Sequence, residues 1–209
     1  MTAIAAEARR PLSSADQLIE ATAALLGRRS AVDVSLSEIA AQSGLNSALI
    51  KYYFGNKEGL LLALLERDAA VAMKALDNLI AMPIAAEDKL RLHIGGIINA
   101  YFRSPYLNRL IHYMIERTGP EASQRVAAIF IEPMLAAYRA IIDQGVAEGR
   151  FRPVDPVFLY HSLVGSCDHL FQAYSPAALG APQLTEDVKQ RYIAHVADMC
   201  LFGMTQRDG

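Results

Sequence analysis

Between residues 46 and 57 the sequence gathers small, hydroxyl-bearing and basic side chains at short spacing. They are Asn46, Ser47, Ala48, Lys51, Tyr52, Tyr53 and Lys57. Small polar side chains at the start of a helix let its backbone approach base edges in a major groove about 12 Å wide. Amino and phenolic groups behind them donate hydrogen bonds to phosphate oxygens. The chemistry that this set supports is therefore recognition of duplex DNA.

The residues that could support catalysis or bind a metal are not spaced for either purpose. His161 and His169 are eight residues apart, about 12 Å along a helix axis, which is too far for both to ligate one ion. Cys167, Asp168 and His169 are neighbours, whose side chains point about 100° apart on a helix. The sequence holds no Cys-x2-Cys pair, phosphate-binding glycine loop or nucleophile elbow. We expect no metal, no cofactor and no enzymatic activity.

Two short helices are expected to position the DNA-contacting residues. Ser35-Leu36-Ser37-Glu38 has the form of a capping box and opens a helix over 35–43, with Gly44 just beyond it. Asn46 caps a second helix over 47–54, and Gly55-Asn56 turns the chain into a long helix over 57–82. Two short helices joined by so tight a turn must cross steeply, as in a helix-turn-helix.

The rest of the chain keeps the 3.6-residue period of helices. We expect a first helix over 13–27 and later ones over 86–102, 105–117, 121–131, 133–148, 156–174 and 185–203. Pro105, Pro133 and Pro156 fit the first turns of three of these, with Ser104 and Asp155 as caps. The sequence therefore predicts an all-α protein of about nine or ten helices, divided into residues 1–58 and residues 59–209.

Length, charge and cysteine content narrow the class of protein. The chain has 209 residues, of which 53% are hydrophobic, a net charge of −2 and two cysteines, Cys167 and Cys200. These values exclude a disordered tail, a disulfide-held scaffold and a uniformly basic nucleic-acid-binding arm. The longest apolar runs have six residues, whereas a bilayer span needs roughly 20. Since no secretory signal is visible, we expect a cytoplasmic protein that makes no membrane contact.

The charge of the N-terminal segment predicts how DNA binding responds to salt. Residues 1–60 hold six basic and six acidic side chains, whereas DNA-binding domains usually carry a positive charge. Lys51 and Lys57 flank the end of the second short helix, and Arg9 and Arg10 precede the first helix. We therefore expect a local basic patch that neutralises few phosphates, and hence a shallow salt dependence.

Three segments within residues 13–65 resemble the N-terminal domain of TetR-family transcriptional regulators. They are Ser35-Leu36-Ser37-Glu38-Ile39-Ala40, Ser43-Gly44-Leu45-Asn46 and Ile50-Lys51-Tyr52-Tyr53-Phe54-Gly55-Asn56-Lys57-Glu58-Gly59-Leu60. Lys51 stands where the family most often has Tyr, and Ser30-Ala31 replaces the usual glycine-aromatic turn. The resemblance implies a DNA-binding role for nine residues: Asn46, Ser47 and Ala48 at the tip of the recognition helix, Lys51, Tyr52, Tyr53 and Lys57 on phosphates, and Leu36 and Ser37 near phosphate.

The same resemblance implies the rest of the architecture. A homodimer through helices 156–174 and 185–203 is expected to bind a near-palindromic operator in double-stranded DNA and to repress transcription. An apolar cavity in the C-terminal helices is expected to hold a small-molecule effector that releases the DNA. Polarity and helical position nominate its lining residues, which are Tyr101, His112, Met114, Phe130, Tyr138, His161, Cys167 and His169.

Two alternatives remain open at the level of sequence. A helical ligand carrier or enzyme could use the N-terminal motif only for packing, although residues 84–209 hold no catalytic or cofactor signature. A DNA-binding protein without any effector fits the same motif. For each histidine, ordinary packing in a helical core competes with a place in a cavity.

Overall fold

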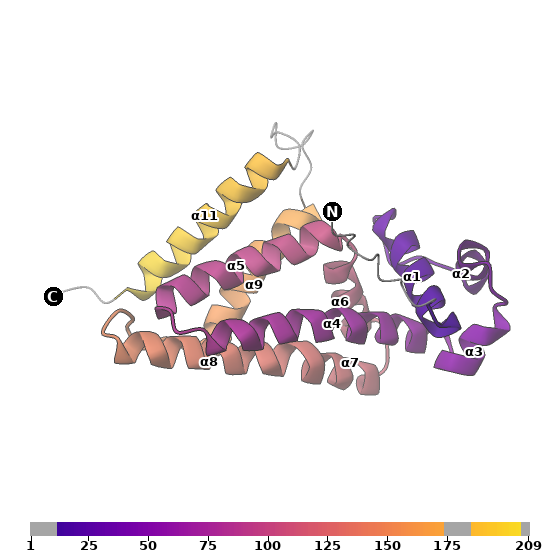
Figure 1. Ribbon diagram of the computed structural model, residues 1–209, viewed down its shortest axis with the longest axis horizontal. Helices are drawn as coiled ribbons and strands as arrows, with labels where there is room; N and C mark the ends of the chain where they lie inside the picture. The colour runs from indigo at the N-terminus through magenta and orange to yellow at the C-terminus, as the bar shows by residue number, and fades with distance from the viewer. Residues whose placement is uncertain (1–11, 174–184, 206–209) are drawn as a thin grey trace, which may run out of the picture. The chain divides into compact units, whose positions relative to one another are not determined.

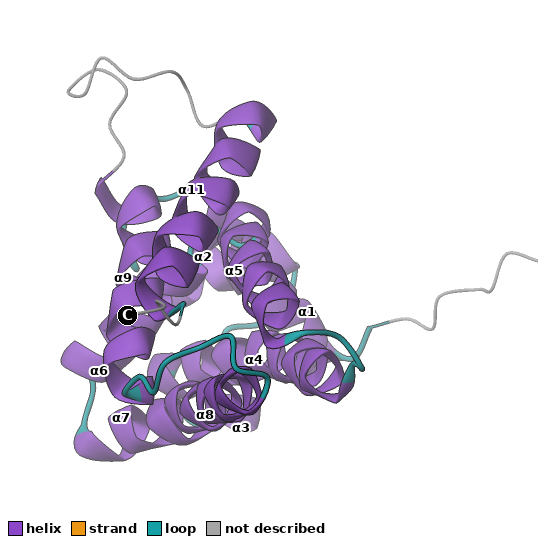
Figure 2. Cartoon of the chain, turned by 90° about the vertical axis from the view of Figure 1, so that its left-hand side faces the viewer, coloured by secondary structure: helices purple, strands orange, loops and turns teal. Residues whose placement is uncertain are grey.

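The computed structural model describes residues 12–173 and 185–205, and the regular elements within them are helices (Figure 2). Apart from helices and loops, these residues form one isolated antiparallel bridge between Phe151 and Thr205. The all-α prediction is confirmed. The chain divides into two compact units, Met1–Leu64 and Leu65–Gly209. The division lies inside α4 (Lys57–Ala81), whereas the division predicted after residue 58 lies in the first turn of that helix.

The N-terminal unit holds three helices before α4, namely α1 (Ser14–Gly27), α2 (Leu36–Ser43) and α3 (Ala48–Phe54) (Figure 1). α1 packs against both α2 and α3. The core of the unit consists of fully buried aliphatic side chains from all four helices, including Leu18, Leu26, Ile39, Ile50, Leu60 and Leu61. Each such side chain contributes about 1.5–3 kcal/mol on burial. This packing stabilises two helices that are too short to persist alone.

Glycines shape the turns on either side of α3. Gly44 and Gly55 have φ values of 70° and 78°, in the left-handed region that favours glycine. At the start of α4, the Asn56 side chain accepts a hydrogen bond of 2.8 Å from the backbone N–H of Gly59. A Cβ atom at Gly59 would lie 2.0 Å from the carbonyl oxygen of Phe54. The chain therefore needs glycine there to enter α4 so closely behind α3.

The C-terminal unit is built around α9 (Pro156–Ala173), which packs against α5 (Ala86–Arg103), α6 (Leu107–Glu116), α8 (Glu132–Ala147) and α11 (Glu186–Met204). α7 (Pro120–Val126) and a π-helical turn, η1 (Ala127–Ile131), lead into α8. The core side chains include Leu90, Ile94, Leu110, Tyr138, Ile141 and Leu163, all fully buried. Each helix of this unit lies within a few residues of its predicted place.

Two predicted details of the C-terminal unit are wrong. Separate helices are predicted over 121–131 and 133–148, but α7, η1 and α8 run without a break from Pro120 to Ala147. The reason lies at Pro133, which has no N–H and whose ring crowds the carbonyl four residues back. The backbone N–H of Glu132 bonds to the carbonyl of Ala127 instead, and the wider π turn accommodates the proline.

The second error concerns the start of α6. Pro105 and Ser104 precede α6, which begins at Leu107, and Ser104 ends α5. The carbonyl of Ser104 accepts a hydrogen bond from the backbone N–H of Leu107, 2.9 Å away. The other predicted cap is confirmed, since Asp155 Oδ1 accepts a hydrogen bond of 2.7 Å from the backbone N–H of Val157. Residue 174 of the predicted helix 156–174, the predicted break at 175–182, and Arg9 and Arg10 lie outside the described residues.

Candidate nucleic-acid interface and effector site

The first turn of α3 is exposed and is capped from its own sequence. Asn46, Ser47 and Ala48 are all exposed to solvent. Asn46 Oδ1 accepts a hydrogen bond of 2.8 Å from the backbone N–H of Ala48, although the N-cap position is occupied by Ser47, one residue later than predicted. No bulky side chain stands at this end of the helix, so its small side chains remain accessible to a partner.

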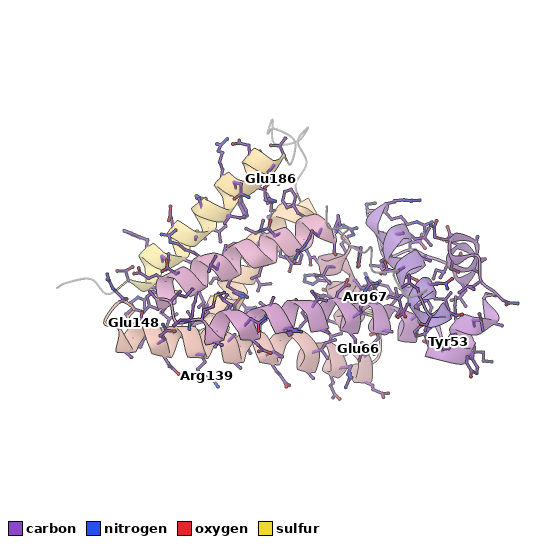
Figure 3. All side chains as sticks on the ribbon, viewed as in Figure 1. Tyr53, Glu66, Arg67, Arg139, Glu148 and Glu186 are labelled. Carbon is purple, nitrogen blue, oxygen red and sulfur yellow. The ribbon has the colours of Figure 1, made fainter. Side chains whose placement is uncertain are left out.

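The exposed side of α3 continues with two aromatic side chains and a lysine. Tyr52 is 79% exposed and Tyr53 is 45% exposed, and their rings meet edge to face with centroids 4.9 Å apart. Figure 3 shows the Tyr53 side chain standing off the ribbon of α3. Lys51 is exposed, and Lys57 is half-buried in the first turn of α4. Phe54 is half-buried. A ring as exposed as that of Tyr52 contributes little to packing within the unit.

The N-terminus of α2 carries a carboxylate that is held by three neighbouring groups. The predicted capping box is confirmed, because the backbone N–H of Glu38 donates to Ser35 Oγ and the backbone N–H of Ser35 donates to Glu38 Oε2. Arg29 forms an ion pair with Glu38. Hydrogen bonds from Arg29 and Ser35 lower the pKa of Glu38 to about 2. Leu36 and Ser37 lie exposed beside this cluster.

In the C-terminal unit, a carboxylate on α9 joins side chains from two other helices. Asp168 is buried, and its Oδ2 lies 2.9 Å from Nε2 of His112 on α6. Tyr101 on α5 is also buried and forms a hydrogen bond with Asp168. Burial, together with the charge of Asp168, raises the pKa of Tyr101 well above its usual range. The three side chains form a polar cluster that extends from the buried Tyr101 and Asp168 to His112, which is exposed.

A second polar pair lies on α5 and α8. His93 Nε2 and the hydroxyl of Tyr138 are 3.1 Å apart, and both side chains are buried. Burial lowers the pKa of His93 to about 4. Tyr160 on α9 lies beside this pair, with its ring centroid 6.3 Å from that of Tyr138. Cys167 is also fully buried, and burial raises the pKa of its thiol to about 12, so it carries no thiolate at neutral pH.

The structure brings some of the predicted effector residues together and leaves others apart. Tyr101, His112, Tyr138 and Cys167 belong to or adjoin the polar groups just described, while Met114 and Phe130 are buried. His161 and His169 are exposed on α9, as His112 is on α6, and the ring of His161 lies 5.3 Å from that of Tyr160, measured between centroids. The role of all these residues in an effector site stays a prediction.

Asp168, His93 and Tyr160, which belong to these polar groups, are not among the residues predicted from the sequence. One signal could have found Asp168, because it is the only charged residue in the 18 residues of α9. A lone carboxylate in such a helix is rarely buried without hydrogen-bonding partners.

The grouping of possible metal ligands and the apolar character of the helices bear on other functions. Within residues 12–173 and 185–205, no three His, Cys, Asp or Glu side chains are grouped so that they could hold a metal ion. In the same part of the chain, no helix combines the length and apolar character that a membrane crossing requires.

Known proteins resemble both units of the chain. Residues 18–64 match the family model of bacterial regulatory proteins of the tetR family, and residues 83–209 match that of the tetracyclin repressor-like C-terminal domain. The HTH-type transcriptional regulator BetI of Brucella abortus is 28% identical over 188 residues, covering 82% of this chain and 87% of its own. BetI of Agrobacterium fabrum is 25% identical and covers 81% and 83%, respectively.

Solved structures share the fold at lower identity. The transcriptional regulator FadR of Bacillus subtilis, solved in complex with stearoyl-CoA, has a TM-score of 0.73 at 19% identity, covering 90% of this chain and 98% of its own. The ketosteroid transcriptional regulator KstR2 of Mycobacterium tuberculosis has a TM-score of 0.71 at 20% identity, covering 96% and 99%. Together with the family models, these matches show that the chain belongs to the TetR family and is a DNA-binding transcriptional regulator.

Proposed function

We propose that the protein is a dimeric repressor that binds a near-palindromic operator and is released from it by a small molecule. The observation that carries the DNA-binding part is the exposed side of α3. Tyr52 is 79% exposed, and the first turn of the helix presents Asn46, Ser47 and Ala48 to solvent. Large aromatic side chains with such exposure mark interaction surfaces, and Tyr52 is next to Lys51 in the sequence.

Each of the nine predicted residues has a role in this proposal. Asn46, Ser47 and Ala48 face base edges, because small side chains admit the helix to the groove. Lys51, Tyr52, Tyr53 and Lys57 donate hydrogen bonds to phosphates. Leu36 and Ser37 bring the N-terminus of α2 near the backbone, where the partial positive charge of a helix N-terminus favours phosphate.

The proposed dimer forms through α9 and α11, which correspond to the predicted helices 156–174 and 185–203. Phe158 on α9 is 70% exposed and Phe202 on α11 is 72% exposed. Val157 and Met199 are exposed on the same two helices. A two-fold dimer places two copies of α3 so that each can enter the major groove at one half-site. The near-palindrome of the operator follows from that symmetry.

The proposed effector site is the set of polar groups among α5, α6, α8 and α9. Asp168, His112 and Tyr101 offer a carboxylate, an imidazole and a phenol, and Tyr138 and Cys167 lie nearby in the same interior. A ligand that binds one conformer of this interior more tightly shifts the population towards it. The affinity for DNA then changes by the same coupling free energy. In this proposal the protein catalyses no reaction, and it acts in the bacterial cytoplasm, where its operator lies.

Footprinting of the DNA that flanks the protein's own gene tests this function. We expect protection of a near-palindrome by the wild-type protein and by Val71→Ala, since Val71 is exposed on α4, in the C-terminal unit. Tyr52→Ala should lose the protection while keeping its helical circular dichroism. Equal protection by Tyr52→Ala would contradict the assignment of α3.

A metabolite panel tests the effector separately from the DNA. A ligand that binds the native state raises the melting temperature by mass action. We expect at least one compound to raise the melting temperature of the wild-type protein and to weaken its footprint. A panel in which compounds stabilise the protein but leave the footprint unchanged would contradict release by that site.

A further inference from the structure

The part of α4 that belongs to the C-terminal unit buries few apolar side chains. From Leu65, where this unit begins, to Ala81, the buried ones are Leu65, Ala69 and Leu76. The other side chains of this stretch are half-buried or exposed. Apolar burial stabilises in proportion to the area removed from water, so here it resists a change in the direction of α4 only weakly. Polar contacts therefore contribute much of what fixes that direction.

A largely buried hydrogen bond joins this stretch of α4 to the start of α6. The hydroxyl of Tyr106, the residue just before α6, donates to Asp68 Oδ2 at 2.7 Å. Tyr106 is buried, and the Asp68 side chain is 14% exposed. Burial and the bond to Asp68 raise the pKa of Tyr106 above its usual range. The hydroxyl therefore keeps its proton and donates it to the carboxylate at neutral pH.

Arg67 holds the Asp68 carboxylate in place for this bond. Its Nε and Nη2 donate to Asp68 Oδ1 at 3.0 and 2.9 Å, whereas Tyr106 bonds to Oδ2. Nη2 of Arg67 also lies 3.4 Å from the Tyr106 hydroxyl. Hydrogen bonds to an ionised group are about twice as strong as those between neutral groups. The bond from Tyr106 is therefore a strong and directed link.

A second polar contact on the same stretch of α4 is weaker. Glu66, labelled in Figure 3, pairs with Arg125 of α7 at 2.7 Å. The side chains of Glu66 and Arg125 are 37% and 59% exposed, and an ion pair with such exposure contributes little. Tyr106 and Asp68 therefore form the stronger polar link between this stretch and the rest of the unit.

α4 is also held at its far end, and it continues into the N-terminal unit. Nζ of Lys89 on α5 donates to the carbonyl of Ile80 at 2.6 Å. Ile80 and Asp68 are twelve residues apart, about 18 Å along the helix, so the two contacts together fix a direction that neither fixes alone. The units divide after Leu64, inside this helix. A change in the direction of α4 therefore moves the N-terminal unit, which carries α3.

We propose that Tyr106 and Asp68 are positioning residues for DNA binding, whose hydrogen bond fixes the direction of α4 and thereby the half-site spacing that the protein accepts. This inference rests on the proposed dimer bound to its operator. Two copies of α3 fill two half-sites at one separation when each α4 is held in one direction. Without the bond, α4 adjusts to other separations. Discrimination between spacings then falls, while the contacts between α3 and DNA are unchanged.

The expected size follows from the geometry of DNA and the strength of the bond. One base pair inserted between the half-sites separates them by about 3.4 Å and rotates one against the other by about 35°. We expect this insertion to weaken wild-type binding at least about tenfold, because the second α3 then misses its groove. A hydrogen bond to a charged group changes an equilibrium by about tenfold or more. Its removal from both protomers should therefore lower the spacing penalty to below about threefold.

Fluorescence anisotropy with the full chain tests the inference. The probes are duplexes that carry the protected near-palindrome with its natural centre, with one base pair inserted and with one base pair removed. Tyr106→Phe loses only the hydroxyl. It should bind the natural spacing within about threefold of wild type and show the reduced spacing penalty. Asp68→Ala removes the acceptor and should act alike, and the double variant should add nothing further, because both changes remove the same bond.

Tyr113→Phe is the matched control. Tyr113 lies on α6 and is half-buried, so the change removes a phenolic hydroxyl from the same helix and leaves the bond to Asp68 intact. This variant should keep the wild-type spacing penalty. The melting temperature of each variant reports a general loss of stability, which would weaken binding to all three duplexes alike.

Three results would overturn the inference, and they differ from the failure of the proposed function. They are a wild-type protein that binds all three spacings equally, Tyr106→Phe and Asp68→Ala variants that keep the full spacing penalty, and a Tyr113→Phe variant that loses it as Tyr106→Phe does. A wild-type protein that binds a single half-site as tightly as the near-palindrome would overturn the proposed dimer on its operator, and the inference with it.

Discussion

Nε2 of His112 lies 2.9 Å from Oδ2 of Asp168, which joins α6 to α9 inside the C-terminal unit. Tyr101 brings α5 to the same carboxylate. α9 also carries the exposed side that we assign to the dimer. In the proposed dimer, a ligand that competes for Asp168 would therefore act on a helix of the interface. A change at Asp168 would then alter the spacing of the two DNA-binding units.

Asp168→Asn tests the role of this carboxylate in the effector response. The amide keeps the size of the side chain but loses the charge that interacts with His112 and Tyr101. We expect operator affinity within about threefold of wild type and an effector response reduced at least about tenfold, as one charged hydrogen bond contributes about 1.5–3 kcal/mol. Titration of the DNA complex with a ligand found in the metabolite panel measures both values.

A matched variant sharpens this prediction. Asp143 lies on the exposed surface of α8, so Asp143→Asn removes one negative charge without touching the cluster. It should retain the wild-type effector response. If Asp168→Asn responds to the ligand like Asp143→Asn, the cluster is not the effector site.

His93 predicts a loss of stability in acid. Burial lowers the pKa of His93 to about 4 from its ordinary value of 6.5. The unfolded chain therefore binds a proton between these values that the folded chain does not. Stability is full above about pH 6.5 and falls as the pH drops towards 4, by on the order of 3 kcal/mol from this group.

Urea unfolding as a function of pH measures this contribution. His93→Gln should flatten the dependence between pH 6.5 and 4, because an amide does not titrate there and can still bond to Tyr138. His195→Gln is the matched control, as His195 is exposed, and it should keep the wild-type slope. An unchanged slope in His93→Gln would show that His93 does not carry the effect.

Gly59→Ala should destabilise the N-terminal unit. The new Cβ would lie 2.0 Å from the carbonyl oxygen of Phe54, and backbone atoms cannot yield as a flexible side chain does. We expect a loss of about 1–3 kcal/mol, which is typical of overpacking. Gly27→Ala is the control, since nothing lies within 4 Å of its Cβ position. Denaturant titration should show less than about 1 kcal/mol for the control; similar losses in both would refute the clash.

The capping box of α2 predicts a second, distinct acid response. Hydrogen bonds from Arg29 and Ser35 lower the pKa of Glu38 to about 2 from its ordinary value of 4.5. A carboxyl with a lowered pKa stabilises the fold above its unfolded value and loses that effect as the pH falls through the folded value. Glu38→Gln should therefore be less sensitive to pH between 4.5 and 2, as measured by melting. Ser35→Ala should lose about 1 kcal/mol at neutral pH.

Local signals in the sequence predicted the N-terminal elements well. The capping box at Ser35 and Glu38, the glycine turn at Gly44 and the Asn46 cap each depend on residues within one helical turn of one another. Such signals survive in a folded chain because they satisfy backbone groups locally. The helix-turn-helix could therefore be predicted from the sequence.

The polar cluster around Asp168 was harder to predict because its contacts join distant parts of the chain. Asp168 meets His112 across 56 positions of sequence, and periodicity says nothing of such pairings. Periodicity also did not predict that His112 of α6 contacts Asp168 while the next residue, His169, is exposed. Pro133 lies in the first turn of α8, as predicted, but a π turn joins α8 to the preceding helix without the expected break.

Fluorescence anisotropy with a duplex carrying the protected near-palindrome tests the central claim, DNA binding by α3, most directly. Wild type, Tyr52→Ala, Lys51→Ala and the control Val71→Ala are titrated at several salt concentrations. We predict at least about tenfold weaker binding for Tyr52→Ala and Lys51→Ala, unchanged binding for Val71→Ala, and a smaller salt slope for Lys51→Ala, by about one charge per subunit. Wild-type affinity in both α3 variants, with wild-type salt slopes, would contradict the account.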